Sequence, residues 1–165
     1  MKDRLFTAAL IAQLALLFYF ELCVLVPLGS WNDQPGANAA FSRANITLGS
    51  LVGAAQLLLL IGTIWRFRPL LWFGLVGDSI WLTLHIYSLW LPYMFGASPQ
   101  YARMYARVFG RTTRWLPNFG NHLAPDAMHI MIDVFVVLVI LTLVPYLISL
   151  SRASRSDAVD ASAAG

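Results

Sequence analysis

Charge and cysteine are both scarce in this sequence, and the shortage of charge excludes a whole class of protein. Charged residues make up 12% of the 165 residues, whereas hydrophobic residues make up 59%. Soluble domains average about 25% charged and about 45–50% apolar residues. A soluble domain of this length has too little interior to cover so much apolar surface. The composition therefore predicts an integral membrane protein.

Thiol chemistry and nucleotide chemistry are also excluded. Cys23 is the only cysteine, so the chain has no intrachain disulfide, no CxxC redox pair and no thiolate metal site. No motif for a nucleotide or a second substrate is present, and no cofactor is predicted. The net charge of +3 reflects Lys and Arg in the loops of a membrane protein. We therefore expect membrane lipids and a hydrophobic small molecule as partners, and no nucleic acid.

Four apolar runs are each long enough to cross a bilayer, which takes about 20 residues. They cover residues 5–28, 46–65, 70–92 and 125–149. The sequence predicts an all-α membrane protein with four transmembrane helices in an up-down bundle, forming a single domain over 1–150. The polar segment 151–165 is expected to be a disordered tail.

The connection between the third and fourth runs contains a predicted amphipathic helix. Ser98 and Pro99 are a good helix start, with serine as the N-cap. Spacings of four, four and three then place basic residues on one face of a helix over 99–115: Arg103, Arg107, Arg111 and Arg114. Such a helix is typical of one that lies in the membrane interface. Its arginines either face lipid headgroups or clamp an anion over a site beneath them.

Basic residues near the ends of the runs give a weak bias in topology. One side carries six of them and the other carries five: Lys2, Arg4, Arg66, Arg68, Arg152 and Arg155 against Arg43 and the four arginines of the amphipathic helix. Cytoplasmic loops hold the excess of Lys and Arg. Both termini are therefore expected in the cytoplasm.

Five ionisable side chains fall inside the predicted spans, where insertion costs roughly 2.5–3.5 kcal/mol for each charged group. They are Glu21, Asp78, His85, His129 and Asp133. Counting about 1.5 Å per residue from the helix ends places all but Asp78 roughly 6–12 Å below the same membrane face. Asp78 lies deeper. The sequence therefore predicts a polar pocket that opens toward this face.

General acid–base catalysis is the chemistry that these groups indicate. Glu21 or Asp78 would donate or accept the proton, since a carboxyl in apolar surroundings suits proton donation. His129 and Asp133 are four residues apart and share a helix face, so Asp133 is expected to orient the His129 ring. His85 is the other predicted partner. The alternative is that these groups pair with one another only to stabilise the bundle.

Aromatic and loop residues complete the predicted site. Trp81 shares a helix face with Asp78 and His85 and would hold a hydrocarbon substrate. A lid is expected from the first loop and the amphipathic helix, with substrate-binding residues Trp31, Asn32, Asp33, Arg103, Arg107 and Arg111. His122 and Asp126 are expected to be exposed.

Three functions follow from these residues. The first is a membrane enzyme that isomerises, cyclises or hydrolyses a lipid-like or isoprenoid molecule. The second is a metal or haem protein. It would use His85 and His129 as axial ligands, or the same pair with Glu21 and Asp133 around a divalent metal.

The third function is a small proton-coupled transporter with Glu21 as the coupling acid. Four helices with a buried glutamate in the first resemble the small multidrug resistance exporters, although the long third connection and the additional buried acids depart from that family. Gly49 and Gly53 are spaced for close approach of two helices. They serve either packing inside one chain or a homodimer.

Overall fold

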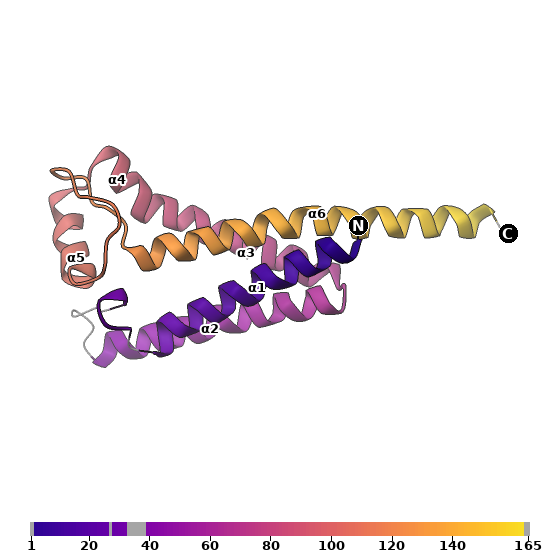
Figure 1. Ribbon diagram of the computed structural model, residues 1–165, viewed down its shortest axis with the longest axis horizontal. Helices are drawn as coiled ribbons and strands as arrows, with labels where there is room; N and C mark the ends of the chain where they lie inside the picture. Colours follow the sequence, from indigo (N-terminus) through magenta and orange to yellow (C-terminus); the bar gives the residue numbers. More distant parts are fainter. Residues whose placement is uncertain (1, 27, 33–38, 164–165) are drawn as a thin grey trace.

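The chain is built from helices joined by short connections and one long one (Figure 1). The computed structural model describes residues 2–26, 28–32 and 39–163, and no strand occurs among them. The elements in chain order are α1 (Lys2–Leu25), the 3₁₀ turn η1 (Gly29–Trp31), α2 (Ala39–Ile64), α3 (Arg68–His85), the π-helix η2 (Ile86–Trp90), α4 (Leu91–Phe95), α5 (Pro99–Phe109) and α6 (Ala127–Ala163). The predicted all-α fold is confirmed.

Three helical stretches of the described chain are long and apolar enough to cross a membrane. They are Arg4–Leu25, Arg68–Phe95 and Ala127–Ala153. A further apolar stretch, Gly49–Ile64 in α2, is shorter. The chain thus has the long apolar helices that a membrane protein requires.

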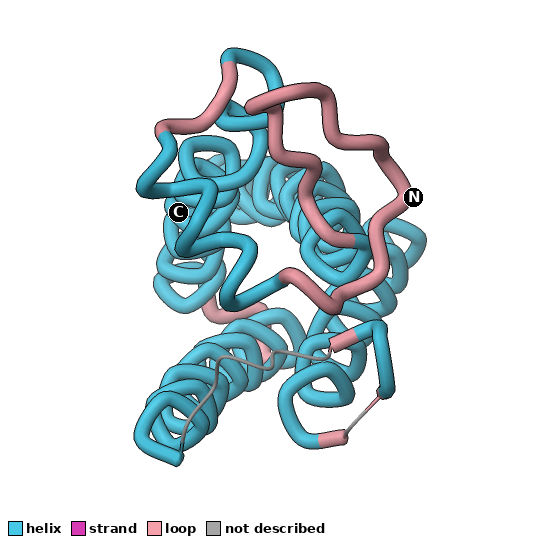
Figure 2. Tube along the Cα trace, turned by 90° about the vertical axis from the view of Figure 1, so that its left-hand side faces the viewer, coloured by secondary structure: helices cyan, strands magenta, loops and turns pink. Residues whose placement is uncertain are grey.

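The four long helices pack side by side. α1 packs against α2 and α6, and α3 packs against the same two helices. Seen end-on, they surround a common axis, with α5 and the connection 110–126 lying across one end (Figure 2). Both termini lie toward the opposite end (Figure 1). The core between the helices is largely aliphatic, with Leu16, Leu59, Val139 and Leu143 fully buried.

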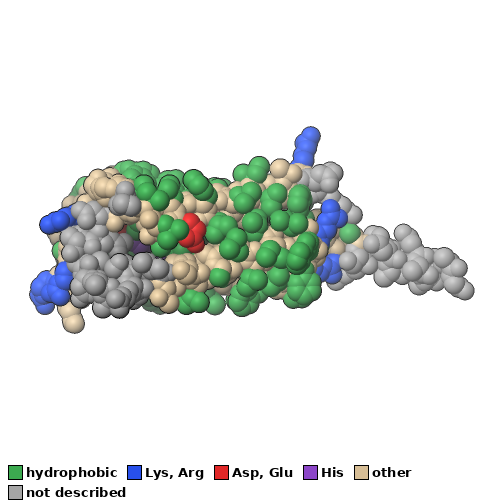
Figure 3. Space-filling view, turned by 90° about the horizontal axis from the view of Figure 1, so that it is seen from below, with side chains coloured by type: hydrophobic (Ala, Val, Ile, Leu, Met, Phe, Trp, Pro, Cys, Tyr) green, Lys and Arg blue, Asp and Glu red, His purple; other side chains and the backbone are tan. Residues whose placement is uncertain are grey.

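The outer surface of the long helices is apolar as well. Large hydrophobic side chains are exposed on each of them, among them Phe18, Leu58, Phe73 and Leu141. Figure 3 shows this apolar band between two ends that carry Lys and Arg. In water such a surface would be an aggregation liability, whereas in a bilayer it contacts lipid.

A buried polar contact joins three of the helices. Gln13 of α1 donates through Nε2 to Oγ1 of Thr63 in α2 at 2.8 Å. The Tyr146 hydroxyl of α6 donates to the Thr63 carbonyl oxygen at 3.2 Å. All three residues are buried. Their hydrogen bonds offset the cost of placing polar groups in an apolar interior.

The sequence predicts that the third helix ends at Pro92, but the helix continues past this residue. Helical structure continues from α3 through η2 into α4 and ends before Gly96. Proline lacks an N–H, and its ring collides with the carbonyl four residues earlier, here that of Ser88. The wide π-helical turn at 86–90 relieves this crowding. The Tyr101 hydroxyl of α5 donates to the Ser88 carbonyl in place of the missing N–H.

The amphipathic helix of the long connection is shorter than the predicted 99–115. Ser98 caps its start as predicted, because its Oγ accepts a hydrogen bond from the Tyr101 amide at 3.2 Å. α5 then ends at Phe109, where Gly110 disfavours a longer helix. The last two arginines of the predicted basic face therefore lie beyond the helix.

α6 is longer than predicted and includes most of the expected tail. It runs from Ala127 to Ala163, so the helix continues through residues 151–163, where the sequence predicts a disordered tail. The segment contains several alanines, which favour helix most strongly, and no proline or internal glycine. Figure 1 shows this part of α6 extending past the other helices.

Two glycines of α3 provide a matched test of helix packing. A Cβ at Gly74 would lie 2.4 Å from Cδ1 of Leu59 in α2, whereas nothing lies within 4 Å of one at Gly77. We expect Gly74→Ala to destabilise the protein by about 1–3 kcal/mol, because overpacking forces the helices apart. Gly77→Ala should be neutral or slightly stabilising. Thermal unfolding in detergent measures both, and equal stabilities would contradict the packing of α2 on α3.

Candidate functional site

Two histidine–carboxylate pairs lie side by side toward the α5 end of α3 and α6. His85 of α3 contacts Asp133 of α6, with Nδ1 2.5 Å from Oδ1. His129 of α6 contacts Asp126, with Nδ1 2.7 Å from Oδ2. The two imidazole rings touch, with centroids 5.5 Å apart. We call these four residues the histidine cluster.

The pairing within the cluster differs from the predicted one. Asp133 does not orient His129. It binds His85 across the interface, and Asp126 takes the predicted role. Positions three and four residues away share a helix face with His129 equally well, so spacing alone does not decide between the two acids. The expectation that Asp126 is exposed is also wrong, because its side chain is fully buried, at 0% exposure.

Hydrogen bonds occupy every polar atom of the His85–Asp133 pair. Trp81 Nε1 donates to His85 Nε2 at 2.8 Å, and Trp90 Nε1 donates to Asp133 Oδ2 at 2.7 Å. An indole N–H only donates, so His85 Nε2 carries a lone pair and the proton lies on Nδ1, facing Asp133. His85 is thus neutral, with both nitrogens engaged. Trp81, which the sequence predicts to hold substrate, thus also supports the His85 ring.

His129 differs from His85 because one of its nitrogens is available. Asp126 holds Nδ1, and the ring packs edge-on against Phe109 of α5 with centroids 5.1 Å apart. Among the described residues, none forms a hydrogen bond with Nε2. A carboxylate that holds the Nδ1 proton leaves Nε2 as the basic atom of the ring. Within the cluster, Nε2 of His129 is therefore the atom best placed to accept a proton.

The start of α6 shows how Asp126 is held in place. Its Oδ1 accepts a hydrogen bond from the His129 backbone N–H at 3.1 Å, which is how an aspartate caps a helix. The Asp126 N–H donates to the Tyr105 hydroxyl at 3.1 Å, and that hydroxyl donates to the Ala124 carbonyl at the same distance. Burial raises the pKa of Tyr105, so its hydroxyl keeps the proton that the second bond needs.

The first loop, which follows α1, packs at the α5 end of the bundle. Its residues Trp31 and Asn32, predicted to bind substrate, both have hydrogen-bond partners within the chain. Trp31 Nε1 donates to the Tyr19 hydroxyl at 2.8 Å, and its ring centroid lies 5.6 Å from that of Trp115. Asn32 closes the end of α1, since its Nδ2 donates to two carbonyls of the preceding segment at 2.7 Å each. Asp33 lies outside the described residues.

The basic face predicted for the amphipathic helix divides into two groups. Arg103, Arg107 and Arg111 are exposed, so they remain available to headgroups or an anion. Arg114 turns inward. Its guanidinium carbon lies 5.6 Å from the centre of the Tyr105 ring, and its Nη2 donates to a carbonyl of α5 at 3.4 Å. Arg114 is therefore the arginine nearest the residues that enclose the histidine cluster.

Asp78 pairs with Gln56 rather than with a histidine. Gln56 Nε2 donates to Asp78 Oδ1 at 2.6 Å, and both side chains are buried. Oδ2 of Asp78 and Oε1 of Gln56 have no partner within the described structure. A proton on Oδ2 would give both atoms a partner, since an acid and an amide can pair through two hydrogen bonds. Asp78 thus serves as a link between α2 and α3.

Glu21 also lies away from the histidine cluster, against α2. A Cβ at Gly53 would be 1.9 Å from Glu21 Oε1, and one at Gly49 would be 2.7 Å from Val24 of α1. The Gly49–Gly53 face is therefore occupied by α1 of the same chain. Among the described acidic side chains, Glu21 alone is not buried. Figure 3 shows acidic atoms at the outer surface, surrounded by hydrophobic side chains.

The predicted metal ligands are not assembled. The described residues contain no group of three or more His, Cys, Asp or Glu side chains that could hold a metal ion. Glu21 faces α2, and Asp133 is committed to His85. His85 cannot ligate haem iron in this arrangement, because both of its nitrogens are hydrogen-bonded.

The Gln56–Asp78 pair predicts opposite outcomes for two substitutions. Asp78→Asn should keep close to wild-type stability, because two amides form the same pair of hydrogen bonds. Gln56→Leu should cost about 1–3 kcal/mol, because it leaves a buried carboxyl without a partner. Thermal unfolding in detergent measures both. A large loss of stability in Asp78→Asn would show instead that the carboxylate is ionised.

The assignment of each acid to its histidine is testable by ¹⁵N NMR. The chain has three histidines, so selective labelling gives few signals, and His→Gln variants assign them. We expect His85 and His129 to carry the proton on Nδ1, since each Nδ1 faces a carboxylate. Asp126→Asn should shift the His129 signals and leave those of His85, and Asp133→Asn should do the reverse. A shift of the His129 signals in Asp133→Asn would instead support the pairing predicted from sequence.

Known proteins offer no guide to this arrangement. No family model, no curated protein and no solved structure matches the chain. The activity of the histidine cluster is therefore inferred from the positions and hydrogen bonds of its own side chains.

Proposed function

We propose that the chain crosses the membrane four times in an up-down bundle, with both termini in the cytoplasm. The apolar part of α2 lies beside α1 and α3 and supports a fourth crossing. Counted along the sequence, the side with both termini has six basic residues and the opposite side has five, which is the direction of the cytoplasmic excess. α5 would then lie in the opposite interface with its exposed arginines facing headgroups.

The function we propose is acid–base catalysis on a hydrophobic small molecule in the membrane. The observation that supports it is the pair of a fully buried Asp126 and a His129 whose Nε2 is available. A carboxylate on Nδ1 fixes the ring and stabilises the imidazolium that forms when Nε2 accepts a proton. In the His85–Asp133 pair, by contrast, every polar side-chain atom is already hydrogen-bonded.

Isomerisation is the reaction that the single base supports best. His129 Nε2 would remove a proton from one carbon of the substrate and return it at another, which needs no second acid and no net oxidation. Glu21 and Asp78, predicted from sequence as proton donors, lie elsewhere. Hydrolysis by a water that His129 activates uses the same base. The surrounding Phe109 ring and apolar helices favour a lipid-like or isoprenoid substrate.

Isotope incorporation tests this function even while the substrate is unidentified. The purified protein is placed in vesicles of lipids extracted from its host membranes, in D₂O enriched in ¹⁸O. Mass spectrometry of the lipids then follows both labels. A proton shift or cyclisation introduces deuterium, and hydrolysis introduces ¹⁸O. We expect His129→Gln to slow the incorporation by about 10²–10⁴-fold, the usual contribution of a general base.

His122→Gln is the matched control for this experiment. His122 contacts the Tyr93 carbonyl at 2.9 Å in the long connection, outside the histidine cluster, so incorporation should be unchanged. Undiminished incorporation in His129→Gln would overturn the assignment. Absence of both labels with the wild-type protein would favour the alternative of a proton-coupled transporter. Glu21, half-buried on an apolar face, is the residue that supports this alternative.

A further inference from the structure

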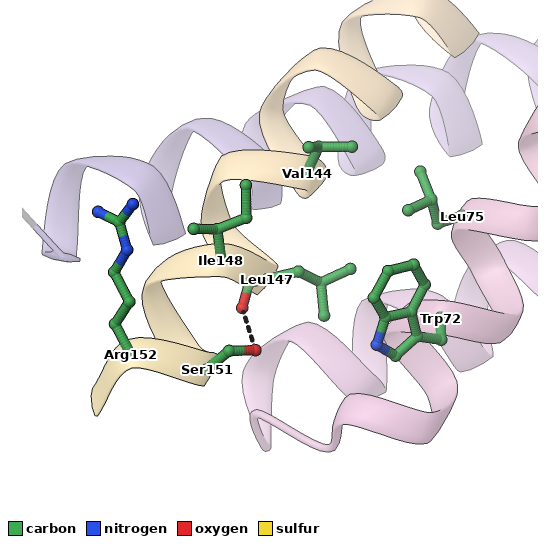
Figure 4. A pocket seen from close by; sticks show the side chains of 7 residues that line it. All are labelled: Trp72, Leu75, Val144, Leu147, Ile148, Ser151 and Arg152. Atoms are coloured by element: carbon green, nitrogen blue, oxygen red, sulfur yellow. Dashed lines mark hydrogen bonds between the residues drawn. The ribbon is translucent and has the colours of Figure 1, made fainter. Parts of the chain in front are cut away.

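A groove between α3 and α6 lies near the end of the molecule that holds the termini (Figure 4). Its volume is about 330 Å³, within the range of small-molecule pockets. Trp72 and Leu75 of α3 form one wall, and residues of α6 between Val144 and Arg152 form the other. His85 ends α3 on the far side, so the groove is separate from the histidine cluster.

The groove is amphipathic along its length. From Val144 to Arg152 it follows α6 for about 12 Å, at 1.5 Å per residue. Its walls are largely aliphatic, its outer end on α6 carries Ser151 and Arg152, and the Trp72 indole lies across the groove on α3. The Ser151 hydroxyl donates to the Leu147 carbonyl at 3.0 Å, as drawn in Figure 4. Among the described side chains, the Arg152 guanidinium is thus the donor left for a ligand at the outer end.

Charge at the groove favours an anion. Arg152 is exposed at its outer end. The Arg68 side chain lies close by, because it donates to the Leu150 carbonyl of α6. All described acidic side chains lie elsewhere, and the nearest along α3 is Asp78, deeper than Leu75 and buried against α2. An anionic group at the outer end would therefore meet positive charge, with no competing carboxylate among the described side chains.

We propose that this groove binds one phospholipid with an anionic headgroup. One acyl chain occupies the aliphatic part between Leu75 and Val144. The phosphate accepts hydrogen bonds from Arg152 at the outer end. Basic pockets between transmembrane helices bind anionic headgroups in this way. The groove opens on the apolar outer surface of the bundle, where bilayer lipid is the molecule present at highest concentration.

Native mass spectrometry with two lipids tests the headgroup. The full-length protein in mild detergent is titrated with phosphatidylglycerol or phosphatidylcholine of identical acyl chains. We expect tighter retention of phosphatidylglycerol, and about a fivefold loss of that preference in Arg152→Gln, the effect of one basic residue near an anionic lipid. Arg4→Gln is the control, because it removes the same charge from an exposed position of α1 that does not line the groove. Equal retention of the two lipids, or equal effects of the two variants, would overturn the proposal.

A second pair of variants tests the acyl chain. Ile148→Trp fills the groove, whereas Leu141→Trp adds the same bulk to an exposed position of the same helix. Both are first shown to fold, by thermal unfolding. We expect Ile148→Trp to lose phosphatidylglycerol and Leu141→Trp to retain it. Equal retention would overturn the groove as the site. A dimer mass that disappears in Ile148→Trp would also overturn it, because a second copy would then occupy the groove.

Discussion

His85 and Asp133 join α3 to α6 inside an apolar bundle, and the geometry of the histidine cluster depends on this contact. Breaking a buried pair by removing one partner typically costs about 3–5 kcal/mol. The contact fixes the His85 ring, against which His129 packs at 5.5 Å. It also frees His129 from Asp133, so that Asp126 alone sets the orientation of the second imidazole. The His85–Asp133 contact between α3 and α6 thereby leaves Asp126 on Nδ1 of His129, and Nε2 of the same ring stays available.

The same requirement, that polar groups in hydrocarbon find partners, accounts for most polar residues in the long helices. Gln13, Thr63 and Tyr146 satisfy one another, and Gln56 and Asp78 form a second pair. These contacts explain the residues without reference to any ligand. What they leave over is chemically informative. Among the described residues, neither Nε2 of His129 nor the carboxylate of Glu21 forms a hydrogen bond with another side chain. A candidate function is best sought at those two groups.

The sequence predicts the helices and the depth of their polar residues better than it predicts contacts between them. Run length and a rise of about 1.5 Å per residue suffice to place His85, His129 and Asp133 at one level. The choice between Asp126 and Asp133 as the partner of His129 depends on how α3 packs against α6. The spacing of residues within one helix does not predict this packing. An aspartate at the helix cap, three residues before a histidine, is the signal that indicates Asp126. The continuation past Pro92 likewise depends on a distant tyrosine.

That tyrosine couples the covering helix to the backbone beneath it. The Tyr101 hydroxyl serves the Ser88 carbonyl that Pro92 cannot. This contact joins the connection between α3 and α6 to the point where α3 continues past its proline. A change at Tyr101 would therefore act on the backbone of a helix that lies 13 residues away in the sequence.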